Sequence, residues 1–146
     1  MYFEEFEENR RIRVGSRSVS AEETDRFIEL VGLTNPIFMS DEGAAAAGHS
    51  RRLVPGPFQL SLAMGMCQQA GLFDRVVAVA QFDRLRFKRP VHPGDTLRME
   101  ALPLEKRPTK NPLRGLVVLR YDLFNQRDEE VLSARGTYLF RTRKAG

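Results

Sequence analysis

One uncharged stretch near the middle of the chain constrains the fold more than any other feature. Residues 53–72 read LVPGPFQLSLAMGMCQQAGL and contain no charged side chain. The Pro-Gly-Pro at 55–57 is typical of a helix start, because proline fits the first helical turn, where its missing N–H is not needed. Apolar side chains then occupy every side of the predicted helix, which indicates a helix that is buried all round. A helix of about sixteen residues is roughly 24 Å long and too short to cross a bilayer, so we expect a core helix wrapped by other elements.

The chain after this helix has the pattern of an antiparallel sheet. Apolar and polar side chains alternate or cluster in five runs joined by short loops, as in consecutive strands. These runs are residues 76–80, 82–87, 96–104, 116–124 and 131–140. A chain of 146 residues has the length of one domain, and we therefore expect a single α+β domain over 1–146.

The chain before the helix is expected to form one strand and two helices. Residues 11–18 alternate and predict a strand. Ser20 and Glu23 form a capping box, which predicts a helix that ends at Gly32. A short alanine-rich helix is expected over 41–47. The apolar face expected for the first helix consists of Phe27, Leu30 and Val31.

Composition excludes several classes of function. The net charge of +4 comes from interspersed acidic and basic residues without a basic run, so we expect no nucleic-acid partner. One cysteine and two histidines cannot supply a disulfide framework or a zinc site. No run is apolar enough for a membrane span, and the acidic, aromatic start is unlike a secretory signal, so we expect a cytoplasmic protein with no membrane partner.

Four segments, in this order, carry a resemblance to a known family. They are YFEEFEENRRI, SRSVSAEETDRFIELVGLTNPIFMSDEGAAAA, RLVPGPFQLSLAMG and RFKRPVHPGDTLRMEALPLEKR. Together they resemble the MaoC-like acyl dehydratases, or (R)-specific enoyl-CoA hydratases, over nearly the whole chain. The resemblance implies a hot-dog fold, in which a curved antiparallel sheet wraps a long central helix. It also implies a lyase of fatty acid metabolism that acts on acyl-CoA-type thioesters.

The catalytic segment departs from the family pattern. Members of the family carry roughly G-D-x-N-P-x-H, whose Asp and His activate water and protonate the substrate, and such a pair must be able to move protons. The corresponding positions here are Leu33 and Phe38, which cannot do so. The turn-forming Asn35 and Pro36 remain, and the resemblance places them among the substrate-binding residues.

The resemblance also assigns residues around the central helix. A serine that the family carries within this helix corresponds to Met64, which we expect to contact substrate. The family's oxyanion donor corresponds to the backbone N–H of Gly56, although a tight turn alone would also require this glycine. His49, in a Gly-His loop before the helix, is a weak candidate for a relocated base, and a surface histidine is the alternative.

Three cations on one side of a predicted strand provide a candidate phosphate site. Arg84, Arg86 and Lys88 alternate along the chain and could bind the phosphates of coenzyme A. The alternative is a solvated sheet face.

These assignments favour a catalytically degenerate, acyl-thioester-binding member of the family. We expect a homodimer, or a heteromer with a catalytic hot-dog subunit, and no cofactor or metal beyond the thioester ligand. The alternatives are an active (R)-enoyl-CoA hydratase or 3-hydroxyacyl dehydratase, and a hot-dog thioesterase, in both cases with relocated catalytic residues.

Overall fold

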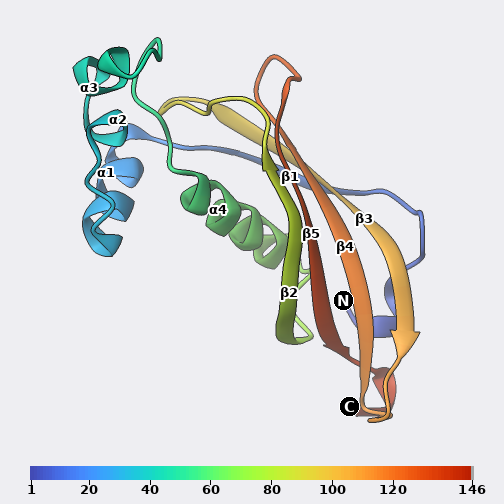
Figure 1. Ribbon diagram of the computed structural model, residues 1–146. Coiled ribbons are helices and arrows are strands. Elements are labelled where there is room, and N and C mark those ends of the chain that lie inside the picture. Colours follow the sequence, from blue (N-terminus) through green and yellow to red (C-terminus); the bar gives the residue numbers. More distant parts are fainter. Residues whose placement is uncertain (146) are drawn as a thin grey trace.

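A five-stranded antiparallel sheet curves around one long helix in the computed structural model, which describes residues 1–145 (Figure 1). The strand order across the sheet is β1-β3-β4-β5-β2, and every neighbouring pair is antiparallel. The strands are β1 (Ile12–Ser18), β2 (Val76–Phe87), β3 (Thr96–Pro108), β4 (Arg114–Phe124) and β5 (Glu130–Arg141). The helices are α1 (Ala21–Val31), α2 (Pro36–Met39), α3 (Asp41–Ala46) and α4 (Gly56–Gln69), with short 3₁₀ turns η1 (Phe3–Glu5) and η2 (Arg143–Ala145). The predicted α+β architecture is confirmed.

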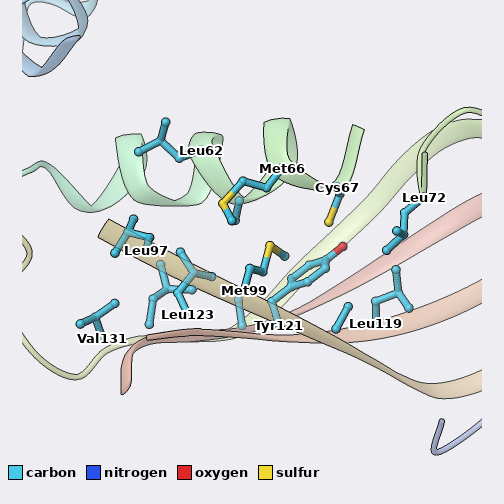
Figure 2. Close-up of a cluster of buried hydrophobic side chains, with 14 of the residues drawn as sticks. Leu62, Met66, Cys67, Leu72, Leu97, Met99, Leu119, Tyr121, Leu123 and Val131 are labelled. Atoms are coloured by element: carbon cyan, nitrogen blue, oxygen red, sulfur yellow. The ribbon is translucent and has the colours of Figure 1, made fainter. Parts of the chain in front are cut away.

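The long helix α4 packs one of its faces into the hollow of the sheet. Its buried residues, among them Leu62, recur at helical spacing, and Met66 and Cys67 point toward Met99 and Tyr121 of the strands (Figure 2). The prediction of a helix buried all round is wrong, because one sheet covers only one side of it. Three residues on the opposite side are exposed, namely Ser61, Gly65 and Gln68.

Strand β2 is an edge of the sheet and carries an unusual amount of exposed apolar surface. It pairs with β5 on one side and has no partner on the other among residues 1–145. Its alternation is broken by an irregularity between Asp83 and Arg86, where Arg84 has a φ of +50°. Five large apolar side chains of this strand are between 38 and 52 % exposed: Val77, Val79, Phe82, Leu85 and Phe87.

Helix α1 has the predicted ends but turns a different face inward. Ser20 and Glu23 form both bonds of the capping box, and Gly32 ends the helix with a φ of +74°. Leu30 and Val31 were expected to be buried, but they are 84 and 55 % exposed. The buried residues are instead Thr24 and Ile28, which lie four positions apart on one face, with Phe27 half-buried beside them.

The helices α1 to α3 form a cap beside the N-terminal end of α4 (Figure 1). The Arg52 guanidinium holds the cap together, because it donates hydrogen bonds to the Asp25 carboxylate and to the backbone carbonyls of Ala21, Phe38 and Met39. The next residue continues this link, since the N–H of Leu53 donates to the carbonyl of Ile37 at 3.0 Å. The segment that leads into α4 is therefore tied to the cap.

Two glycine substitutions test the packing under α4. A Cβ at Gly136 of β5 would collide with the buried Tyr138 hydroxyl, so we expect Gly136→Ala to lower the free energy of unfolding by about 1–3 kcal/mol. Gly65 of α4 has open space around its Cβ position, and Gly65→Ala should raise that free energy by about 0.5–1 kcal/mol. Urea unfolding of the wild type and both variants measures these free energies of unfolding. Equal changes in the two variants would contradict the packing described for Gly136 and Gly65.

Candidate functional site

A pocket of about 400 Å³ lies at the N-terminal end of α4. The cap contributes Ile37 and Phe38 to its wall, the start of α4 contributes Gly56 and Gln59, and the end of β2 contributes Phe87. The wall is mainly apolar. Among the lining residues in the described chain the ionisable side chains are two cations, and none is an Asp, Glu, His or Cys.

Gly56 presents a free backbone donor at this pocket. It is the first residue of α4, and within residues 1–145 neither its N–H nor that of Phe58 donates to a backbone carbonyl. Pro57 has no N–H, so the two free donors and the helix dipole together favour an oxygen atom with partial negative charge. A side chain would not fit here, since a Cβ at Gly56 would lie 2.6 Å from the Phe87 ring. Both interpretations of Gly56, as a donor and as a tight approach, are compatible with this geometry.

The two positions that the resemblance aligns with the family's acid–base pair, Leu33 and Phe38, are apolar and differently placed. Phe38 is half-buried and lines the pocket. Leu33 is half-buried directly after the end of α1, where its N–H donates to the carbonyl of Ile28, and it is not among the pocket-lining residues of the described chain. The structure therefore brings Phe38, but not Leu33, to Gly56.

Asn35 and Pro36 have structural contacts in the cap. The Asn35 side chain caps α2 by accepting a hydrogen bond from the Ile37 N–H at 3.0 Å. Pro36 occupies the first turn of α2 and packs so closely on Gly43 that no residue larger than glycine fits at position 43. His49 is half-buried after α3 and, like these two residues, does not line the pocket within the described chain.

Met64 belongs to a buried polar cluster rather than to the pocket. Its sulfur accepts a hydrogen bond from the Tyr138 hydroxyl at 3.3 Å, and the Tyr121 hydroxyl donates to Tyr138. Burial raises the pKa of both tyrosines and raises the pKa of the nearby Cys67 thiol to about 12. All three groups are protonated at neutral pH, so none of them can serve as a base or nucleophile.

Arg84, Arg86 and Lys88 line a separate groove of about 340 Å³, together with Arg120 and Arg135. The groove lies on the side of the sheet away from α4, because Arg120 and Arg135 alternate along their strands with buried core residues. Nothing in the sequence indicated that these two arginines join the cluster, since that depends on which strands are neighbours.

Acidic neighbours neutralise part of this groove. Three of its cations form ion pairs, Lys88 with Glu130 at 2.9 Å, Arg120 with Asp122 at 3.1 Å, and Arg135 with Asp83. Arg84 and Arg86 form no ion pair within residues 1–145 and remain available to an anion.

Lys88 connects the groove with the pocket. It lines both depressions, directly after β2 ends at Phe87. An extended ligand could therefore place an anionic group in the groove and another group beside Gly56.

Other ligand types find little support in the described residues. Residues 1–145 hold no group of three or more His, Cys, Asp or Glu side chains that could bind a metal ion. None of the helices in this range is long and apolar enough to cross a membrane.

Comparison with known proteins identifies the family to which the chain belongs. The family model described as MaoC like domain matches residues 5–120 of this chain. A monoamine oxidase regulatory protein from Archaeoglobus is 29 % identical in sequence, with a TM-score of 0.88 over 97 % of this chain and 95 % of that one. A chain of the HadBC (3R-hydroxyacyl-ACP dehydratase) complex from Mycobacterium tuberculosis is 25 % identical, with a TM-score of 0.76 over 90 % of this chain and 96 % of that one.

A further structure identifies the architecture by name. A Mycobacterium tuberculosis protein described as having a double hot-dog fold is 22 % identical, with a TM-score of 0.84. The match covers 97 % of this chain and 44 % of that protein, which corresponds to one of two such units. The curved sheet around α4 is thus a hot-dog fold, and the chain belongs to the family of proteins with a MaoC-like domain.

Proposed function

We propose that this chain binds acyl-CoA-type thioesters and does not itself hydrate or dehydrate them. One observation carries the proposal: the pocket at α4 offers the free N–H of Gly56 and an apolar wall, but no lining Asp, Glu, His or Cys within the described residues. General acid–base groups contribute about 10²–10⁴-fold each, so a site that lacks both retains little activity. Leu33 and Phe38 fill the positions of that pair.

The ligand follows from what the site can hold. The donors at the start of α4 suit the carbonyl oxygen of a thioester. The unpaired Arg84 and Arg86 suit the phosphates of coenzyme A, and Lys88 lies between the two depressions. This role requires no cofactor besides the thioester, and cytoplasmic fatty acid metabolism is part of the proposal.

The alternatives with relocated catalytic residues have less support. An active hydratase or a thioesterase needs a base or a nucleophile near the thioester carbon. His49 does not line the pocket, and Cys67 is buried with a pKa of about 12. No other described residue at the pocket supplies the missing chemistry.

The proposal includes a partner subunit that pairs with strand β2. An unpaired edge strand with exposed apolar side chains is a template for pairing with another strand. Strand β2 has these properties, and the outward face of α4 is uncovered as well. A second copy of this chain can pair antiparallel with the same strand, whereas a catalytic hot-dog subunit is the alternative. The HadBC relative is described as a complex, which supports pairing between related subunits.

Thioester binding is tested by titration calorimetry with butyryl-CoA. We expect binding without turnover, and Arg86→Glu should weaken it roughly tenfold or more, because the variant places a carboxylate opposite the phosphates. The matched control is Arg13→Glu, which makes the same charge change on the exposed part of β1 and should leave binding unchanged. Equal losses in both variants would contradict the groove assignment, and failure of the wild type to bind would contradict the proposed function.

Pairing through β2 is tested by light scattering on a sizing column. The wild type should have a mass about twice the 16.7 kDa of one chain. Val79→Lys, at a position 52 % exposed on β2, should give a monomer because lysine on an edge strand blocks pairing. Leu30→Lys, at a position 84 % exposed on α1, is the control and should stay dimeric. A wild-type monomer would contradict self-pairing and would leave the catalytic subunit as the partner.

A further inference from the structure

Gln59 is a polar residue on the apolar, sheet-facing side of α4. It lies in the first turn of the helix, and its side chain is on the same face as the buried Leu62, Ala63 and Met66. Only 4 % of Gln59 is exposed. An apolar side chain would satisfy the packing at this position, so packing alone does not explain an amide there.

The Gln59 amide has one partner and lacks another. Its Nε2 donates to the carbonyl of Val54 at 3.1 Å, and this fixes the orientation of the amide, because only the nitrogen can donate. Its Oε1 is buried and has no hydrogen-bond partner within the described residues. Buried side-chain oxygens normally have partners, and one that lacks a partner in the free protein is poised to accept a hydrogen bond from a ligand.

Gln59, which carries this free acceptor, lines the same pocket as Gly56, whose N–H is a free donor. Gly56 and Gln59 are three residues apart in α4 and therefore lie on the same side of the helix, and both line the pocket. The ring of Phe87 covers Gly56 and is 49 % exposed. A ligand that contacts the first turn of α4 must displace this ring, which is outside the cluster of buried core residues.

We propose that Gln59 is a specificity-determining residue, whose Oε1 accepts a hydrogen bond from an O–H or N–H of the bound thioester while the N–H of Gly56 holds the carbonyl oxygen. This inference rests on the proposed thioester-binding function. The site then selects a ligand that carries a donor close to its acyl carbonyl. Two groups of an acyl-CoA meet that description, a hydroxyl on the acyl chain and the amide N–H of the pantetheine arm.

The test compares two probes, 3-hydroxybutyryl-CoA and butyryl-CoA, by titration calorimetry. The variant is Gln59→Met, which keeps the length of the side chain and removes the amide. The control is Gln69→Met, the same change at an exposed position of the same helix. Loss of one hydrogen bond should weaken binding about tenfold in Gln59→Met, and the control should stay within about twofold of the wild type.

The pattern of losses identifies the donor. A loss restricted to 3-hydroxybutyryl-CoA supports the proposal and assigns the acyl hydroxyl, and an equal loss for both probes supports it and assigns the pantetheine amide. Unchanged binding of both probes by Gln59→Met would overturn the proposal and would leave an ordered water as the partner of Oε1. Failure of the wild type to bind either probe is a separate result, which would overturn the proposed function and this inference together.

An NMR measurement on the wild type tests the same hydrogen bond even if the Gln59→Met variant does not fold. The side-chain amide protons of Gln59 should shift in the NMR spectrum when 3-hydroxybutyryl-CoA is added, because their carbonyl gains a partner. Amide signals that stay in place while the ligand binds would overturn the proposal.

Discussion

The packing of one face of α4 into the curved sheet is the interaction on which the rest of the structure depends. It buries Leu62, Met66 and Cys67 against the strands and so fixes where the helix begins. That start lies beside the end of β2 and under the cap of α1 to α3, which together form the pocket. The same packing leaves the other face of α4 and the edge of β2 uncovered, so the folded chain has both a site and a surface suited to a second subunit.

The site combines a hot-dog scaffold with a pocket whose described lining holds no Asp, Glu, His or Cys. The helix start still offers the N–H of Gly56, and the Arg52 hydrogen bonds still hold the cap against it. Phe38, which the resemblance aligns with the family's histidine, lines the pocket. Its ring contributes to the apolar wall of the pocket. This lining is the basis of the proposal that the chain holds a thioester without converting it.

Sequence analysis succeeded where the determinants are local and failed where they depend on neighbours in space. The capping box of Ser20 and the glycine end of α1 follow from adjacent residues, and the structure confirms them. The strands lie where they were predicted, but residues 76–80 and 82–87 form one strand and β3 continues to Pro108. The burial of Leu30 was predicted wrongly, because which face of a short helix turns inward depends on the elements beside it. The place of Gln59 in the pocket and that of Arg120 in the same groove as the β2 cations were not foreseen, since both depend on how α4 and the strands meet.

The measurement that tests this account most directly is an assay of the purified chain for hydration of short and medium trans-2-enoyl-CoA. Hydration removes the conjugated double bond, so the absorbance of the unsaturated thioester reports turnover. The account predicts no turnover above the background rate, because neither Leu33 nor Phe38 can move a proton. Robust turnover by this chain alone would contradict the account and would make His49 the first residue to replace.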